Sequence, residues 1–280
     1  MTLTNFLENT NLEGSPLISV IVPTKNEEKN IGRLINSIQK THGYSKDKIE
    51  IIVVDNPGTT DKTREIANQF GNVELFIQGP ERSSQRNLGA SKAKGQYLYF
   101  VDADMEFGPD TLNKIVVKLS PQTTLIVPEQ IPGNSIYCRA INVEKQIYKS
   151  NPKISAARIM TKVKFTQVGG YDTEMVSGED WDLYKRLQDS GLKVDFVDSH
   201  ILHNEQDLTF WSSISKKIYY AKKLKNYKVG IQTEVNPIYR IAILFGKPQV
   251  IFSDFVAWVY LVLLKMTQFG VGFVIYKMPN

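Results

Sequence analysis

In the first two thirds of the chain, short apolar runs alternate with segments whose apolar residues have helical spacing. This alternation constrains the fold more than any other feature. The run LISVIV at 17–22 is typical of a buried strand, and the segment after it spaces its apolar residues as a helix lying on a sheet does. Repeated strand–helix units with short connections predict an α/β fold, with a mostly parallel sheet and helices on both faces. The pattern predicts strands at 17–22, 49–55, 73–77 and 96–101, and helices at 26–40, 61–70 and 83–94.

Polar residues stand at the ends of three predicted strands. Pro23 and Thr24 follow the first strand, Asp55 ends the second, and Asp102 follows the fourth. Because the carboxyl ends of parallel strands meet at the edge where ligands bind, we expect these residues to line one pocket. Asp55 is placed to accept hydrogen bonds from a nucleoside base or ribose, and the alternative is a turn residue before the segment NPGTTD.

Two acids, Asp102 and Asp104, stand one residue apart where the apolar run 96–101 stops. Neighbouring carboxylates repel each other and raise each other's pKa unless a cation lies between them. Mg²⁺ or Mn²⁺, held by one or two carboxylates and the phosphates of a substrate, removes that conflict. The alternative is a solvated loop before the next helix, for which Asp110 is a suitable N-cap.

Two common nucleotide-binding motifs are missing from this chain of 280 residues. The segment VPTKNEE stands where a dinucleotide-binding G-x-G-x-x-G turn would follow the first strand, and no G-x-x-x-x-G-K-[ST] loop occurs. A dehydrogenase and a P-loop nucleotidase are therefore both disfavoured. The single cysteine, Cys138, excludes an internal disulfide and is compatible with a reducing cytosol.

Five ordered stretches within residues 17–203 closely resemble glycosyltransferase family 2, whose members have the GT-A fold. Five stretches in order are far more specific than any one of them. The resemblance implies a Rossmann-like GT-A domain, a nucleotide-sugar donor and a divalent cation. The stretches are SVIVPTKNEEKNI, IIVVDNPGTTDKT, RSSQRNLGASKAKGQYLYFVDAD, FTQVGGYD and SGEDWDLYKRL.

The resemblance gives roles to the residues at the strand ends. Asp102 and Asp104 become the metal-binding Asp-x-Asp motif, whose cation neutralises a leaving diphosphate. His203 stands where some relatives place a histidine that touches the metal or diphosphate; the alternatives are a structural or solvated histidine, or His200 as the ligand. The residues implied to bind the nucleotide sugar are Pro23, Thr24, Glu27 and Asp55 at the nucleoside, Arg86 near the diphosphate or sugar, and Asp102.

One departure from the family pattern affects the nucleoside site. Relatives commonly have Asp-Asp-Gly-Ser after the second strand, whereas this chain has Asp55 followed by Asn56 and Pro57. The base and ribose contacts are therefore left open. The Q-x-x-R-W motif of processive polysaccharide synthases does not occur, which favours transfer of a single sugar.

The segment GEDWDL opens a predicted helix with acids in its first turn, where the amino end of a helix favours ionised side chains. An acceptor hydroxyl must lose a proton as it attacks, so a carboxylate should serve as general base. The resemblance assigns the base to Asp180, with Glu179 orienting the acceptor or a neighbouring loop. The alternative is that Glu179, Asp180 and Asp182 form only a charged first turn. One base and one metal site imply direct displacement, and hence inversion at the anomeric carbon.

A basic segment and an apolar segment follow the resembling region. Six lysines and no acid occur between Leu208 and Gly230, which indicates a negatively charged partner. The apolar stretch 255–276 approaches the length of about 20 residues that a spanning helix needs, and it suits helices lying in the membrane interface at least as well. The alternative is a helix packed on the core. Lipid fits this combination better than nucleic acid does, so we expect a membrane surface and no nucleic acid as partner.

These features predict a flexible arm at 1–16, a GT-A domain at 17–205, and basic amphipathic and apolar membrane-associated helices at 206–280. The expected protein is an inverting, metal-dependent glycosyltransferase on the cytoplasmic side of a membrane. It would move one sugar from GDP-mannose or a UDP-sugar to a hydroxyl of a lipid-linked saccharide or glycolipid, and a homo-oligomer is left open. The alternatives are a polyprenyl-phosphate sugar synthase, whose ionised acceptor needs no base, and a catalytically silent subunit that binds sugar nucleotide or membrane.

Overall fold

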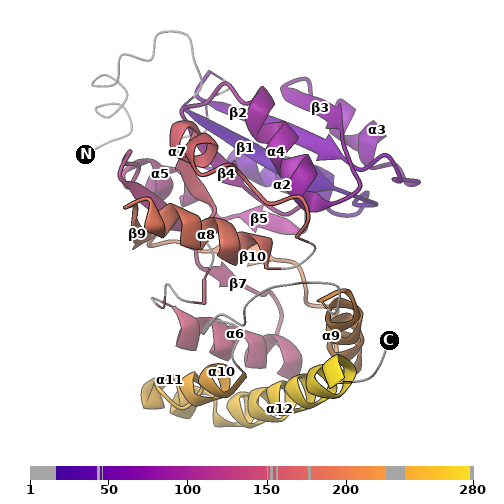
Figure 1. Cartoon of the computed structure of the whole chain (residues 1–280), viewed down its shortest axis with the longest axis vertical. Coiled ribbons are helices and arrows are strands. Elements are labelled where there is room, and N and C mark those ends of the chain that lie inside the picture. Colours follow the sequence, from indigo (N-terminus) through magenta and orange to yellow (C-terminus); the bar gives the residue numbers. More distant parts are fainter. Residues whose placement is uncertain are drawn as a thin grey trace. The chain divides into compact units, whose positions relative to one another are not determined.

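The chain separates into two compact units (Figure 1). The computed structural model describes residues 17–42, 45, 47–149, 151, 154–155, 157–175, 178–224 and 237–277. The sheet unit contains the described residues of 1–128 and 156–202, and the helical unit contains those of 129–155 and 203–280. The arm expected at 1–16 lies outside the described residues.

The sheet unit is built on a seven-stranded, mostly parallel sheet in the order β3-β2-β1-β4-β8-β6-β9. β1 pairs in parallel with β2 and β4, whereas β8 runs antiparallel to β4 and β6. The expected α/β class with its mostly parallel sheet is therefore confirmed. The strands are β1 (Ile18–Thr24), β2 (Ile49–Asp55), β3 (Val73–Ile77), β4 (Tyr97–Phe100), β6 (Thr123–Ile126), β8 (Ile159–Thr161) and β9 (Lys193–Phe196), with the short β5 (Met105–Phe107) and β10 (Ile201–His203) outside this sheet.

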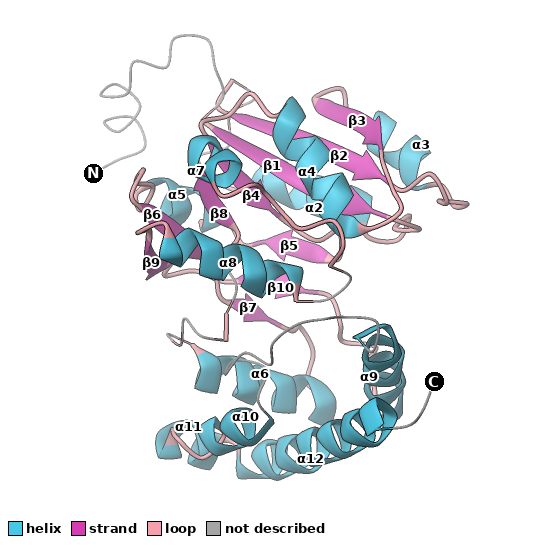
Figure 2. Ribbon diagram, viewed as in Figure 1, coloured by secondary structure: helices cyan, strands magenta, loops and turns pink. Residues whose placement is uncertain are grey.

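Helices cover both faces of the sheet, as the strand–helix repeats predict (Figure 2). Alternate residues of a strand point to opposite faces, so Val20 and Val22 of β1 pack in one core while Ile21 packs in the other. Both faces of β1 are fully buried, which explains its continuous apolar run. The helices are α2 (Ile31–Lys40) and α5 (Thr111–Val116) in the first core, α4 (Arg82–Lys92), α7 (Lys162–Gln167) and α8 (Glu179–Asp189) in the second, and α3 (Thr63–Asn68) beside α2.

Gly89 of α4 marks a close approach between that helix and the sheet. A β-carbon at Gly89 would lie 2.4 Å from Cγ2 of Ile21, which is closer than packed carbon atoms come. We expect Gly89→Ala to lower the free energy of unfolding by about 1–3 kcal/mol, the usual cost of overpacking a core. Gly71 has no atom within 4 Å of its β-carbon position, so Gly71→Ala is the matched control. Urea unfolding of both variants checks this, and equal midpoints would contradict the close packing of α4.

The helical unit joins an internal segment to the C-terminal helices. Residues 129–155 contribute α6, and its apolar Ala140, Val143 and Ile147 pack in one core with Ala257 and Leu261. The division therefore differs from the expected boundary at 205, because the apolar face of α6 is buried against α12 of the C-terminal region. The elements are β7 (Glu129–Gln130), α6 (Ile136–Tyr148), α9 (Phe210–Leu224), α10 (Pro237–Ile243), α11 (Pro248–Ser253) and α12 (Phe255–Lys277).

The longest helix among the described residues, α12, has the length and composition of a membrane span over Phe255–Ile275, which is weak evidence of membrane association. It packs against α6 and α9, and large apolar side chains are exposed along it, among them Val256, Leu263 and Phe273. Of the predicted lysine run, Lys225 and Lys228 lie outside the described residues. The apolar helix expected near the C-terminus is therefore present, while its relation to a bilayer stays a prediction.

Candidate active site

The ends of β1 and β2 lie side by side, as the strand pattern predicts. Thr24 is opposite Asp55 in the register, and its Oγ1 donates a hydrogen bond of 2.7 Å to Oδ1 of Asp55. Arg64 of α3 donates from Nε to Oδ2 of the same carboxylate at 2.6 Å. Asp55 is fully buried, so these bonds offset the cost of removing its charge from water. The structure thus brings Thr24 and Asp55 together at the predicted edge, already held by neighbouring side chains.

Glu27 lies three residues after the end of β1, and other acids affect its pKa. Burial raises the pKa of Glu27 above its ordinary value, a hydrogen bond from Asn30 opposes the rise, and the carboxylates of Asp104 and Asp102 add to it. The bond from Asn30 Nδ2 to Glu27 Oε2 is 2.8 Å long. The carboxylates that follow β4 thus make it harder to ionise Glu27, which follows β1.

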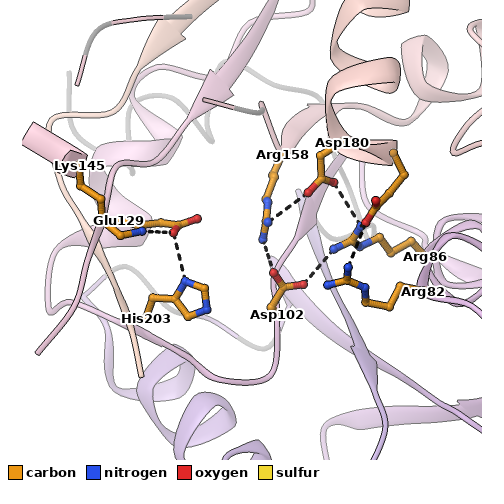
Figure 3. Close-up of polar contacts among 9 residues, drawn as sticks. Arg82, Arg86, Asp102, Glu129, Lys145, Arg158, Asp180 and His203 are labelled. Carbon is orange, nitrogen blue, oxygen red and sulfur yellow. Dashed lines mark hydrogen bonds and ion pairs between the residues drawn. The ribbon is translucent and has the colours of Figure 1, made fainter. Parts of the chain in front are cut away.

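Two arginines bridge the carboxylates that the sequence analysis selects (Figure 3). Asp102 accepts hydrogen bonds from Arg86 Nη2 at 2.9 Å and from Arg158 Nη1 at 2.7 Å. Asp180 accepts from Arg86 Nη1 and from Arg158 Nη2, each at 3.2 Å. Glu179 Oε1 also accepts from Arg86, at 3.1 Å. These five side chains form one network that links the end of β4 to the first turn of α8.

The network fixes the ionisation of both aspartates. Burial alone would raise the pKa of Asp102, but the guanidinium groups of Arg158 and Arg86 outweigh it and hold that pKa well below its usual range. The pKa of Asp180 is lowered for the same reason, with Arg86 contributing more than Arg158. Both carboxylates are therefore anionic at neutral pH. A carboxylate with a lowered pKa is a weak base, so Asp180 can accept a proton efficiently only after an arginine turns away.

Local structure explains how each acid is positioned. Gly178 has φ 85°, a backbone conformation that favours glycine, and it lies at the N-cap of α8. Glu179 and Asp180 therefore occupy the first turn, as predicted, and Arg86 reaches them from the middle of α4. Arg86 is 1 % exposed, and its guanidinium lies 5.0 Å from the ring centre of Tyr171, a residue of the quoted stretch FTQVGGYD.

Arg158 is the site residue that the sequence analysis misses. It precedes β8, and β4 Phe100 donates a backbone hydrogen bond to its carbonyl oxygen at 3.0 Å. Because β8 runs antiparallel to β4, the beginning of β8 meets the carboxyl end of β4, which brings Arg158 to Asp102. The stretch AARIMTK contains no local signal of that direction. In the sequence, the only indication that Arg158 belongs to the site is its position directly before a short apolar run.

Asp102 and Asp104 are the residues that would hold a divalent cation at this site. Among the described residues no group of three or more His, Cys, Asp or Glu side chains could hold a metal ion. Carboxylate oxygens nevertheless suit Mg²⁺ and Mn²⁺, which are commonly held by one or two carboxylates plus substrate phosphates. The donor chemistry therefore fits a cation shared with a substrate. Both oxygens of Asp102 accept from arginines here, so a cation at Asp102 would compete with Arg86 and Arg158 for these oxygens.

His203 belongs to the helical unit. Its Nδ1 lies 3.1 Å from Oε2 of Glu129, which also pairs with Lys145 of α6 (Figure 3). Its expected role as a metal ligand beside Asp102 and Asp104 stays a prediction, as do the donor-binding roles of Pro23, Thr24, Glu27 and Asp55.

Comparisons with known proteins find glycosyltransferases among the relatives of this chain. The family model described as glycosyl transferase family 2 matches residues 19–153, and that described as the N-terminal domain of galactosyltransferase matches residues 140–207. Glycosyltransferase AglE of Haloferax volcanii is 30% identical over 198 residues, which is 65% of this chain and 64% of that protein. The chain is therefore similar to glycosyltransferase family 2 over residues 19–153.

Solved structures support the fold. Mannosyltransferase PcManGT from Pyrobaculum calidifontis, solved in complex with GDP-Man and Mn²⁺, has a TM-score of 0.62 at 17% identity, covering 96% of this chain and 92% of that one. Staphylococcus aureus TarS has a TM-score of 0.56 at 20% identity, covering 85% of this chain and 44% of that one. The chain spans less than two thirds of the curated relatives AglE and TarS, at 64% and 17% of their lengths. The expected GT-A fold is confirmed.

Proposed function

We propose that this protein is an inverting, metal-dependent glycosyltransferase that moves one sugar from a nucleotide sugar to a hydroxyl of a lipid-linked saccharide or glycolipid at a membrane. The observation that carries the proposal is the bridged network at the carboxyl end of β4. There Asp102 and Asp180 share the guanidinium groups of Arg86 and Arg158. A diphosphate between these arginines would replace carboxylates as their partner and separate the two acids.

Arg158 is the residue that we expect to turn toward the diphosphate. Its side chain is 20 % exposed, against 1 % for Arg86, so it needs less rearrangement to leave Asp102 and Asp180. Guanidinium groups bind phosphate oxygens with two parallel hydrogen bonds. Once Arg158 leaves, Asp102 has an oxygen open to a cation, and the pKa of Asp180 rises toward its ordinary value.

Each acidic residue of the site then has a separate role in the proposed reaction. Asp180 accepts the proton of the acceptor hydroxyl as its oxygen attacks the anomeric carbon, and the diphosphate leaves from the opposite side with inversion. Glu179, still held by Arg86, orients the acceptor or the adjoining loop. Mg²⁺ or Mn²⁺ held by Asp102 and Asp104, with His203 as a further candidate ligand, would supply Lewis-acid stabilisation of the leaving oxygens. Pro23, Thr24, Glu27 and Asp55 would contact the nucleoside.

The donor and the acceptor are proposed from separate observations. TarS was solved with UDP and UDP-GlcNAc, and PcManGT with GDP-Man, so GDP-mannose and UDP-sugars are the donors to examine. The exposed apolar side chains of α12 support an acceptor at a membrane. The proposed cytoplasmic side rests on the sequence alone. Homo-oligomer formation is compatible with this function and is not needed for it.

The function is tested by nucleoside diphosphate release from the full chain in detergent. GDP-, UDP- and dTDP-sugars are supplied with Mn²⁺, Mg²⁺ or EDTA, with and without a lipid extract. We expect release from one donor, abolished by EDTA, restored by Mn²⁺ or Mg²⁺ and increased by lipid. Release that persists in EDTA would assign diphosphate neutralisation to Arg86 and Arg158 alone. No release from any donor would favour the silent binding subunit.

A polyprenyl-phosphate sugar synthase is the second candidate. Dolichol-phosphate mannosyltransferase of Saccharomyces cerevisiae is 33% identical over 126 residues, which is 42% of this chain and 46% of that protein. Its name implies a phosphate acceptor, which is already ionised and needs no general base. The role of Asp180 therefore separates the two candidates.

A further inference from the structure

The two faces of α12 differ in burial along most of its length. Ala257, Leu261 and Leu264 are fully buried at helical spacing, in cores that α12 shares with α6. Residues three and four apart share a face of a helix, so these three side chains form one packed face. A second apolar set with helical spacing is exposed on the other side of α12. Its members are Val256, Val259, Leu263, Met266 and Val274, each at least 38 % exposed.

Charged side chains of neighbouring helices contact α12 near its start, in its middle and near its end. Arg139 of α6 forms an ion pair of 2.6 Å with the aspartate that precedes α12. Lys265, in the middle of α12, pairs with the buried Glu144 of α6 at 2.7 Å. Near the end, a β-carbon at Gly272 would lie 3.9 Å from Cε of Lys217 on α9. Helices that carry charged side chains therefore accompany α12 from one end to the other.

This packing disfavours a position of α12 across a bilayer. The hydrocarbon core of a bilayer is about 30 Å thick. The 13 residues of α6 make a helix of only about 20 Å, so α6 would end inside the hydrocarbon if α12 crossed it. Arg139 of α6 has a side chain that is 44 % exposed, and an exposed charge in the bilayer core is costly. The length of α12 permits a span, but the helices packed on it do not fit one.

The exposed face of α12 indicates what covers it instead. Lys265 is the only charged residue of Phe255–Ile275, and its side chain is 16 % exposed because it pairs with α6. Phe245 and Phe255 are each more than half exposed and both pack on Trp258, so the apolar surface continues beyond α12. A protein–protein interface has a polar rim. A long apolar face without exposed charge suits the boundary between lipid head groups and acyl chains better.

We propose that α12 lies in the plane of one membrane leaflet, with its exposed face among the acyl chains near the head groups, and does not cross the bilayer. Both ends of α12 then lie on the same side of the membrane. The inference deepens the membrane part of the proposed function and rests on that part alone. Neither a nucleotide sugar nor transfer of a sugar is needed to test it.

Spin labels along the exposed face measure the depth of each position. Cys138 is the only natural cysteine and is buried, so Cys138→Ser of the full chain gives a background without another thiol. Val256, Leu263, Met266 and Val274 are replaced by cysteine one at a time and labelled. Collision rates with oxygen and with a water-soluble nickel complex are measured in vesicles of phosphatidylcholine and phosphatidylglycerol, without donor and in EDTA.

We expect all four labels at one depth, about 5–10 Å below the head groups. Val256 and Val274 are 18 residues apart, about 27 Å along the helix, so a spanning helix would give depths that change steeply and are greatest near Leu263. Such a profile would overturn the proposal. Labels that remain in water would overturn it together with the membrane part of the proposed function. Contact between labels of two chains, without lipid contact, would assign the face to a second copy and also overturn it.

The control position is Val163 of α7 in the sheet unit. It is a valine with 74 % exposure, against 65 % for Val256, and it is not part of the exposed face of α12. We expect a label at Val163 to stay in water. If that label lay as deep as the labels on α12, lipid contact would be unspecific and the proposal would fail.

Vesicle flotation of single variants supplies a second measurement. Val256→Asn, Leu263→Asn and Val274→Asn should each weaken vesicle binding about tenfold, because each removes a similar apolar side chain from the acyl boundary. Val163→Asn should change binding by less than about twofold. A loss confined to Leu263→Asn would show that only the middle of α12 lies in hydrocarbon, which contradicts an in-plane helix. Thermal unfolding in detergent checks that each variant is folded.

The outcome is independent of the sugar-transfer test. Equal depths along α12, together with no nucleoside diphosphate release from any donor, would refute only the proposed enzyme. Release that is stimulated by lipid, together with a steep depth profile, would refute only the in-plane position of α12.

Discussion

Replacing Asp180 with asparagine is expected to lower kcat for transfer to a hydroxyl acceptor by about 10²- to 10⁴-fold, the usual contribution of a general base. Asparagine keeps the shape of the side chain but cannot take the proton from the hydroxyl. The KM for the nucleotide sugar should change little, because Arg86 and Asp102 keep their mutual contact. Initial rates at saturating donor, with the donor and the lipid acceptor that the release experiment selects, provide the measurement.

The control for this substitution lies on the same helix. Asp182 pairs with Arg186 four residues on, away from the arginines of the network, so Asp182→Asn removes one charge from α8 without touching them. We expect it to alter kcat by less than about threefold. If Asp180→Asn retains full activity, the acceptor is already ionised, and the polyprenyl-phosphate synthase replaces the hydroxyl-directed enzyme. Thermal unfolding of each variant separates lost catalysis from lost folding.

Replacing Arg86 with glutamine is expected to lower the free energy of unfolding by about 3–5 kcal/mol at neutral pH, the usual effect of removing one partner from a buried ion pair. Arg86 contacts Asp102, Glu179 and Asp180, and the variant leaves these carboxylates with less positive charge. Arg82, one turn earlier on α4, is half-exposed and lies 3.5 Å from Glu179. Arg82→Gln should therefore lower the free energy of unfolding by less than about 1 kcal/mol. Urea unfolding of both variants provides the comparison.

The effect of Arg86→Gln should depend on pH in a defined direction. In the natural chain the pKa of folded Asp102 lies below the unfolded value of about 3.9, so its stabilising contribution is present above that pH and is lost in more acidic solution. In the variant, fewer cations oppose the rise that burial causes in the pKa of the aspartates. Protonation of these aspartates therefore removes buried charges that Arg86 no longer neutralises. The difference in stability between the two chains should narrow as the pH falls from about 7 to about 4. A constant difference over this range would show that the carboxylates do not stabilise the fold through Arg86.

Much of the site could be predicted from residues that lie next to one another in the chain. Apolar runs that stop at Thr24, Asp55 and Asp102 predict strand ends, and parallel pairing places those ends at one edge. The stretch GEDWDL predicts the start of α8 because Gly178 and three acids suit an N-terminal turn. These features depend on local periodicity and on backbone conformation, which neighbouring residues determine.

Arg158 and the composition of the helical unit could not be predicted in this way. Arg158 meets Asp102 only because β8 runs antiparallel to β4, and strand direction depends on pairing between residues far apart in the chain. Likewise, α6 packs with α12 because their apolar faces are complementary in three dimensions. The sequence by itself therefore determined the strands, the helix starts and the acids at the sheet edge. Only the tertiary structure decided which cations neutralise those acids and which helices pack together in the helical unit, because long-range packing decides which segments meet.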